Sequence, residues 1–131
     1  MNRAQAQAWI DAYGEAWRAK DASGAAALFT EDGVYKSHPF READVSREGI
    51  SNYWMRATHD QRDLELHFGD PVVEGDHVAV EWWAAMTDDT GDVTLPGALI
   101  LRFSDDGFCE ELREYWHIEA GRHRPFEGWG R

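Results

Sequence analysis

The chain has 131 residues, of which 43% are hydrophobic and 29% are charged, and its formal net charge at pH 7 is −12. Such a charge excludes the basic surface that nucleic acids and anionic membranes require. No apolar run reaches the roughly 20 residues of a membrane-spanning helix. Seven tryptophans in so short a chain predict a large aromatic core or a pocket lined with rings.

The first predicted element is an amphipathic helix over residues 4–20. Trp9, Tyr13 and Trp17 recur at every fourth position, so their rings share one face of this helix. That face is expected to pack toward the interior, or to line a pocket there.

Two short elements follow this helix. Asp21 can cap a second helix through residues 25–29, because its carboxylate can accept hydrogen bonds from the free amides of the first turn. The sequence GVYKSH then predicts a strand that ends at Pro39, because proline lacks the amide hydrogen that a sheet needs. Pro39 also biases His38 toward an extended backbone.

A third helix is predicted after a loop. Ser46 is a good N-cap residue, and the apolar residues after it follow the i, i+3, i+4, i+7 spacing of one helix face. These residues are Ile50, Tyr53, Trp54 and Ala57.

From residue 64 onward the pattern becomes extended. Turn-like sequences (EGDH, TDDTGD and SDDG) separate four predicted strands, at 64–74, 77–87, 93–103 and 108–118. Helices followed by a run of strands indicate an α+β fold with the helices on one face of an antiparallel sheet. A strongly twisted sheet of this kind curves around a helix and leaves a cone-shaped cavity. Residues 119–131 lack periodicity and are expected to form an irregular tail of a single domain over 1–131.

The last predicted strand carries an unusual carboxylate. Side chains alternate between faces, so Glu114 falls in the inward row between Leu112 and Trp116, whereas Cys109 falls in the outward row. A carboxyl group held out of water has a raised pKa and can act as a general acid or base. The plainer interpretation is a glutamate paired with an arginine or a backbone amide beneath the sheet.

The same alternation separates two neighbouring tryptophans. Trp82 is predicted to point inward and Trp83 toward the outer face of the sheet. A large exposed ring more often marks a protein contact than a substrate site, so we expect a homodimer through the outer sheet face.

Three segments and their order resemble the nuclear transport factor 2-like superfamily, in particular its SnoaL-like branch. The segments are AYGEAWRAKDASGAAALFTEDGVYKSHPF, GISNYW and DDGFCEELREYWHI, which together span nearly the whole chain. The resemblance implies a cystatin-like roll, that is, a curved sheet and helices around a cone-shaped cavity, and members commonly dimerise through the outer face. It leaves the reaction open, since members include isomerases, cyclases, epoxide hydrolases, dehydratases and transport adaptors.

Ketosteroid isomerase-like members of this superfamily imply roles for some residues. Tyr13 stands eight residues before Asp21, at the position of an oxyanion-binding tyrosine, and His38 precedes Pro39 near the position of the catalytic base. Leu99 stands where these members have a second, acidic donor, so that donor is absent here. The plainer interpretations are that His38 bonds to a loop at a strand end and that Tyr13 belongs to the core.

Limonene epoxide hydrolase-like members carry an acid in their last strand, in a run similar to REYWH. The resemblance places Glu114 at that acid. The arginine and the second acid of those members would fall near Trp82 and Ala84, so this catalytic set is incomplete here.

The sequence therefore predicts a protein that binds a small, mostly apolar, carbonyl-bearing molecule. If it is catalytic, Glu114 and His38 would exchange a proton and Tyr13 would stabilise an oxyanion, in an isomerisation, cyclisation or dehydration. The alternative is a binding or dimerisation module without turnover. The residues expected to line the pocket or the core are Trp17, Tyr35, Phe40, Trp54, Trp82, Met86, Leu99 and Trp116.

No metal or cofactor is expected. The six histidines show neither H-x-x-x-H nor H-E-x-x-H spacing, and the chain has no G-x-G-x-x-G or Walker sequence. The single cysteine, Cys109, allows no internal disulfide, which favours a reducing, cytoplasmic location.

Overall fold

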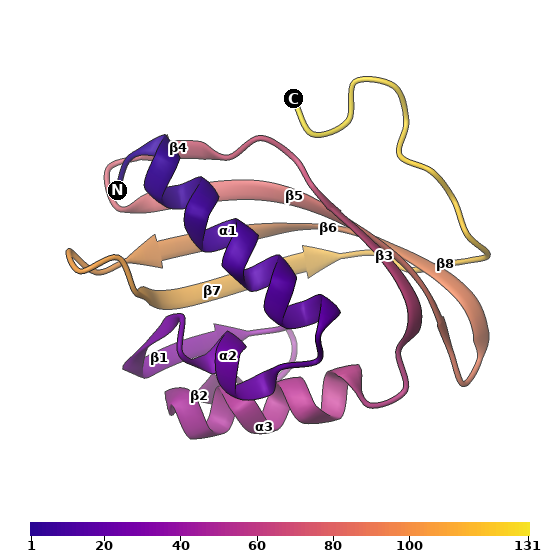
Figure 1. Cartoon of the computed structure of the whole chain (residues 1–131), viewed down its shortest axis with the longest axis horizontal. Coiled ribbons are helices and arrows are strands. Elements are labelled where there is room, and N and C mark those ends of the chain that lie inside the picture. The colour runs from indigo at the N-terminus through magenta and orange to yellow at the C-terminus, as the bar shows by residue number, and fades with distance from the viewer.

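Most of the helical residues precede most of the strands in the computed structural model, which describes residues 1–131 (Figure 1). The helices are α1 (Arg3–Arg18), α2 (Ala22–Ala26) and α3 (Ser46–Thr58). The strands are β1 (Phe29–Lys36), β2 (Asp44–Val45), β3 (Arg62–Phe68), β4 (Val72–Glu74), β5 (His77–Asp88), β6 (Gly91–Phe103), β7 (Cys109–Trp116) and β8 (Glu119–Ala120). This order confirms the predicted α+β fold.

Helix α1 begins with a capping box. The side chain of Asn2 accepts a hydrogen bond from the backbone N–H of Gln5, and the side chain of Gln5 accepts one from the backbone of Asn2, both at 2.8 Å. The predicted ring face is buried, with Trp9 and Tyr13 stacked at 5.1 Å and Trp17 edge-on to Tyr13. No helix has both the length and the apolar character needed to cross a membrane.

The sheet is curved, open and mostly antiparallel, in the order β2-β1-β7-β6-β5-β3, with β4 on β5 and β8 on β6. The predicted antiparallel pairing is found in every strand pair except one, because β1 and β7 run parallel. The chain leaves β1, passes through α3 and the other strands, and returns beside β1 in the same direction. In Figure 1, α1 crosses one face of this sheet, and α3 lies along its β1 edge.

The predicted strand over 64–74 is divided into β3 and β4. Pro71 lies in the break and cannot donate a ladder hydrogen bond. The C-terminal tail also approaches here, where the amide of Asp70 donates to the carbonyl of Gly130 at 2.7 Å. Gly69 has no side chain to obstruct this approach, since a Cβ there would overlap the backbone of Gly130.

The prediction that Cys109 points outward is wrong, because β7 begins with a β-bulge. Phe103 pairs with Cys109 whereas Arg102 pairs with Glu111, so Glu110 is an extra residue that reverses the alternation of side chains. Cys109 is consequently fully buried rather than outward. Glu110 instead forms an ion pair with Arg102.

The C-terminal tail covers part of the outer sheet face. Trp83 lies on this face as predicted, but its indole N–H donates to the carbonyl of His123 at 2.8 Å. The ring also meets Trp129 edge-on, with 6.0 Å between centroids. Trp83 is therefore half-buried under the chain's own tail.

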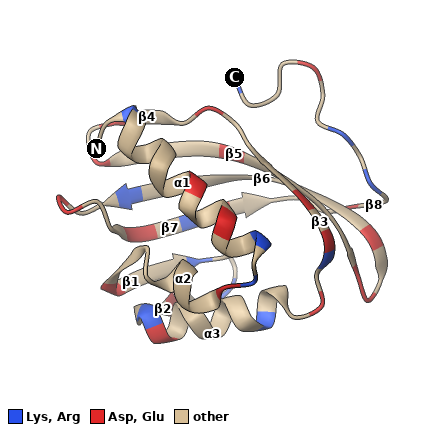
Figure 2. Cartoon of the chain, viewed as in Figure 1, with Lys and Arg blue, Asp and Glu red and all other residues tan.

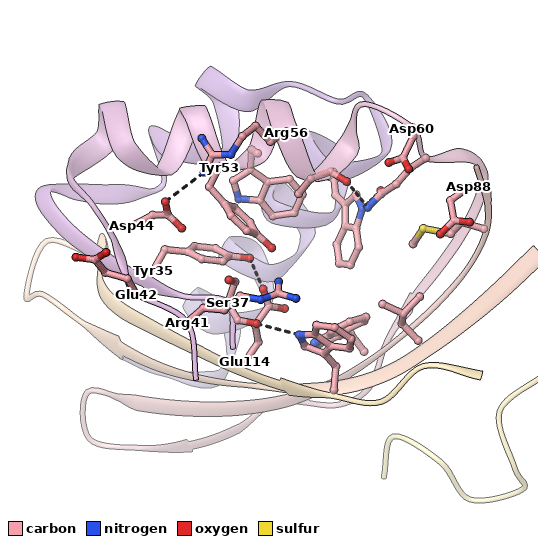
Figure 3. A pocket seen from close by; sticks show the side chains of 18 residues that line it. Tyr35, Ser37, Arg41, Glu42, Asp44, Tyr53, Arg56, Asp60, Asp88 and Glu114 are labelled. Atoms are coloured by element: carbon pink, nitrogen blue, oxygen red, sulfur yellow. Dashed lines mark hydrogen bonds and ion pairs between the residues drawn. The ribbon is translucent and has the colours of Figure 1, made fainter. Parts of the chain in front are cut away.

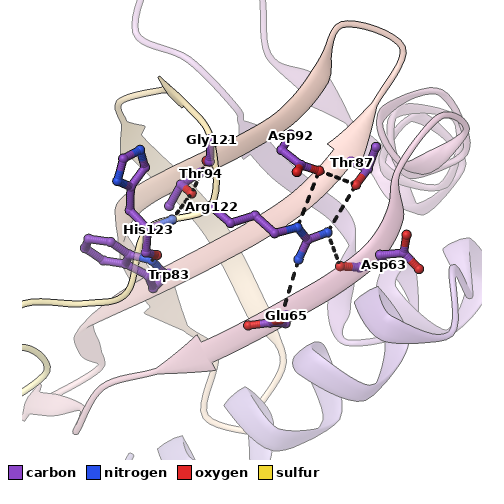
Figure 4. A network of polar contacts seen from close by, with 9 residues as sticks. All are labelled: Asp63, Glu65, Trp83, Thr87, Asp92, Thr94, Gly121, Arg122 and His123. Atoms are coloured by element: carbon purple, nitrogen blue, oxygen red, sulfur yellow. Dashed lines mark hydrogen bonds and ion pairs between the residues drawn. The ribbon is translucent and has the colours of Figure 1, made fainter.

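Arg122 fixes this tail to the sheet (Figure 4). Its guanidinium donates to the carbonyl oxygen of Asp63 at 2.7 Å and lies 3.6 Å and 3.5 Å from the carboxylates of Glu65 and Asp92. The hydroxyl of Thr94 donates to the carbonyl of Gly121 at 2.7 Å. The tail is thus held by side chains from three strands, although only β8 has regular structure.

Candidate active site

A cavity of about 710 Å³ lies between the helices and the sheet (Figure 3). Six of the predicted pocket residues line it: Trp17, Tyr35, Trp54, Trp82, Met86 and Trp116. They come from α1, β1, α3, β5 and β7, so elements far apart in the sequence build one aromatic wall. The polar lining is concentrated near Glu114 and along the rim.

Glu114 is the buried carboxyl group of this cavity. It is only 6% exposed, and one of its oxygens accepts a hydrogen bond from the hydroxyl of Tyr35 at 2.7 Å. Burial raises the pKa of Glu114 from 4.5 to about 7, and the Tyr35 hydrogen bond and the positive charge of Arg41 only partly oppose this rise. Both protonation states are therefore populated near neutral pH, as a proton-transfer group requires.

Two tyrosine hydroxyls connect α1 to Glu114. The hydroxyl oxygens of Tyr13 and Tyr35 are 2.8 Å apart, and both side chains are 1% exposed. Burial and the nearby charge of Glu114 raise the pKa of each phenol well above its usual value, so both stay protonated. Tyr13 does not line the cavity, and it reaches Glu114 only through Tyr35.

His38 lies away from Glu114. The chain turns outward after β1, and His38 lines a separate hollow of about 480 Å³ with Pro39 and Phe40. Its Nδ1 accepts a hydrogen bond from the amide of Phe40 at 3.1 Å, which matches the plainer interpretation of a strand-end histidine bonded to a loop. Trp116 lines both hollows and meets the His38 ring edge-on at 5.6 Å.

Two other predicted pocket residues do not line the Glu114 cavity. Phe40 is 93% exposed, because its loop projects from the sheet. Leu99 is 1% exposed and belongs to the core, where it pairs with Glu114 across β6 and β7. Neither residue can contact a ligand in the cavity without a rearrangement.

Three polar residues near Glu114 were not predicted. Ser37, Arg41 and Tyr53 line the same cavity, and Figure 3 shows their side chains gathered around Glu114 and Tyr35. Tyr53 stands beside Trp54 in the helical pattern, which is the one sequence signal that could have identified it. Arg41 lies in an irregular loop, where no periodicity indicates the direction of a side chain.

Carboxylates dominate the rim of the cavity. Glu42, Asp44, Asp60 and Asp88 line it, and among their carboxylates only that of Asp44 is paired with an arginine, at 3.4 Å from Arg56. A ligand that carries negative charge would meet repulsion at this rim, whereas a neutral one would not. No group of three or more histidine, cysteine or acidic side chains is arranged to hold a metal ion.

The sequence of residues 10–111 matches the family described as the SnoaL-like domain. No curated protein matches the chain. Many solved structures are similar to this chain, and three of them match it over most of both chains.

One structure is a hypothetical protein from Catenulispora acidiphila, described as having a ketosteroid isomerase-like fold in complex with trimethylamine. It is 22% identical, covers 82% of this chain and 83% of its own, and gives a TM-score of 0.74. A second is SalBIII, described as an epoxide hydrolase/cyclase-like enzyme with a role in pyran ring formation in the polyether salinomycin (18% identity; 88% and 97% coverage; TM-score 0.72). The third is RV0760c from Mycobacterium tuberculosis (14% identity; 92% and 99% coverage; TM-score 0.79). These likenesses show a shared fold.

Proposed function

The chain belongs to the SnoaL-like domain family, and on this basis we propose that it transfers a proton to or from a small, mostly apolar, carbonyl-bearing molecule without a cofactor. One observation carries the proposal: Glu114 is 6% exposed, lines a cavity of about 710 Å³ and has a pKa raised to about 7. A carboxyl group with only a structural role would be expected to form an ion pair, and Glu114 forms none.

The chemistry follows from the two states of Glu114. As a carboxylate it removes a proton from a carbon next to the ligand's carbonyl group, and the electron pair of the broken C–H bond forms an enolate. The protonated Glu114 then returns the proton to another atom, which completes an isomerisation, or assists a ring closure or the loss of water. The hydroxyl of Tyr35 holds the carboxyl group in position at 2.7 Å.

Two similar structures support this class of function. One holds a small organic molecule, trimethylamine, and the other is described as an epoxide hydrolase/cyclase-like enzyme. Both share the fold of this chain, and a cavity of this kind suits small-molecule chemistry.

The test is hydrogen exchange of cyclic ketones in D₂O, followed by mass spectrometry. The wild-type protein should accelerate deuterium incorporation next to the carbonyl group. The rate should rise with pH through a midpoint near 7, the pKa of Glu114, and level off once Glu114 is fully ionised. Glu114→Gln should lower the rate by roughly 10²- to 10⁴-fold, since the base is lost. Glu111→Gln, on the outer face of the same strand, is the control. Equal rates for wild type and Glu114→Gln would refute the assignment.

A binding module without turnover is the second candidate. The separation of His38 from Glu114 favours it, because the predicted pair of proton-transfer groups is not assembled. Under this alternative, ketones bind in the cavity but none is deuterated faster than in buffer.

A homodimer through the outer sheet face is also part of the proposal. The tail occupies the region around Trp83, so the partner would contact the remaining outer surface. Tyr115 lies there, near the C-terminal end of β7, and is 48% exposed.

A further inference from the structure

The groups that the family resemblance implies as oxyanion donors are not available to a ligand. Tyr13 lies behind Tyr35 and outside the cavity. Leu99, at the position of the second donor, offers no polar hydrogen. A proton transfer at Glu114 would nevertheless create negative charge on a ligand oxygen, and this charge needs hydrogen-bond donors.

Arg41 is one candidate donor. It lies in the loop between β1 and β2, its guanidinium carbon is 5.9 Å from the centre of the Trp116 ring, and Figure 3 shows the group extending into the cavity near Ser37 and Glu114. It forms no ion pair, unlike Arg56 on the rim, which is paired with Asp44 at 3.4 Å. The N–H groups of Arg41 are therefore free to bind a ligand.

Tyr53 is the second candidate. Its ring packs on Tyr35 with 4.7 Å between centroids, and Figure 3 shows its hydroxyl directed toward the Tyr35 hydroxyl and the carboxyl group of Glu114. Burial raises the pKa of Glu114, and a hydrogen bond from Tyr53 to this carboxyl group partly opposes that rise. Burial and the charge of Glu114 raise the pKa of the Tyr53 phenol, so it remains a hydrogen-bond donor at all ordinary pH values.

Two indole groups of the wall are also hydrogen-bond donors, but they are buried behind its surface. The indole nitrogens of Trp54 and Trp82 are buried and have no acceptor. The donors that line the cavity beside Glu114 are therefore the N–H groups of Arg41 and the hydroxyl of Tyr53, which suits a ligand that brings an acceptor oxygen.

We propose that Arg41 and Tyr53 form the oxygen-binding end of the cavity, where they donate hydrogen bonds to the carbonyl oxygen of the ligand. This assignment rests on the proposed function, which makes the ligand a carbonyl compound. When Glu114 removes a proton, negative charge moves from its carboxylate to the ligand oxygen, and the Arg41 cation stays close to that charge. The acidic rim selects a ligand that enters neutral and becomes an oxyanion only inside.

The experiment compares acetophenone with α-methylstyrene, which replaces the C=O group by C=CH₂ and keeps the shape. Dissociation constants are measured by NMR titration of the tryptophan indole N–H signals, since four tryptophans line the cavity. Wild type should prefer the ketone. Arg41→Met and Tyr53→Phe should each reduce that preference about fivefold, the effect of one hydrogen bond, with little change for the alkene.

Arg56→Met is the matched control, because this arginine lines the same cavity but is neutralised by Asp44. This variant should leave the ratio of the dissociation constants for the ketone and the alkene unchanged. A role in packing alone would weaken the binding of both probes equally. An unchanged ratio in both Arg41→Met and Tyr53→Phe would overturn the proposal, as would a wild-type protein without ketone preference.

This outcome is separable from that of the proposed function. The ratio is an equilibrium quantity that needs no turnover, whereas the Glu114 assignment depends on deuterium exchange. If Arg41→Met and Tyr53→Phe lose the ketone preference while Glu114→Gln exchanges deuterium as fast as wild type, the oxygen-binding site is supported and the proton transfer is refuted. If both variants keep the ketone preference while Glu114→Gln slows the exchange, only the oxygen-binding site is refuted.

Discussion

Glu114 shows how burial alone can prepare a side chain for acid–base chemistry. Its position on an inward row removes it from water, and the Tyr35 hydroxyl supplies one hydrogen bond without neutralising its charge. The sequence predicted this inward direction from alternation, because β7 is regular from Glu111 onward. It could not predict Arg41 as a neighbour, because an irregular loop has no period.

The raised pKa of Glu114 predicts how the stability of the protein depends on pH. Its pKa rises from 4.5 to about 7 on folding, so the folded state binds this proton more tightly than the unfolded state. The resulting stabilisation is complete below pH 4.5 and is lost as the pH rises through about 7.

Glu114→Gln cannot ionise and should lack this dependence. Between pH 5.5 and pH 8, the free energy of unfolding of wild type should fall by about 2 kcal/mol more than that of the variant. Urea denaturation at the two pH values measures the difference, and comparison with the variant cancels the titration of the histidines. Parallel changes in the two proteins would show that Glu114 is not buried as a titrating group.

At the scale of elements, strand register decides which side chains meet across the sheet. Trp82 on β5 pairs with Gly97 on β6, and the indole ring lies over the glycine. A Cβ at position 97 would overlap that ring. The cavity wall at Trp82 therefore depends on the absence of a side chain on the next strand.

Gly97→Ala should force the Trp82 ring to move. We expect a loss of about 1–3 kcal/mol in the free energy of unfolding, the usual cost of overpacking, and a changed Trp82 indole signal in NMR spectra. Gly49→Ala is the control, since a Cβ there meets no atom closer than 3.7 Å. A fully stable Gly97→Ala protein with an unchanged indole signal would contradict this packing.

At the scale of the whole molecule, the acidic residues behind the net charge of −12 lie on helices, strands and turns alike (Figure 2). The tail contains three of the arginines, and Arg122 among them binds acidic side chains of the sheet. The tail therefore both covers an outer aromatic ring and offsets local negative charge.

The proposed homodimer makes Tyr115 an interface residue. Tyr115→Glu places a charge on the outer face, so it should convert a dimer into a monomer in sedimentation equilibrium. Met55→Glu, at a position on α3 that is 61% exposed, should remain dimeric. A wild-type protein that sediments as a monomer would contradict the proposal directly.

The sequence by itself determined the class of fold and the inward direction of Glu114. Helical spacing, strand alternation and capping residues are local patterns, and they are preserved wherever the chain is regular. Only the tertiary structure decided the parallel pairing of β1 with β7, the burial of Cys109 behind a bulge, and the position of the tail over Trp83. It also decided that Arg41 and Tyr53, rather than His38 and Tyr13, line the cavity beside Glu114. These outcomes depend on contacts between residues far apart in the chain and on irregular segments, which carry no periodic signal.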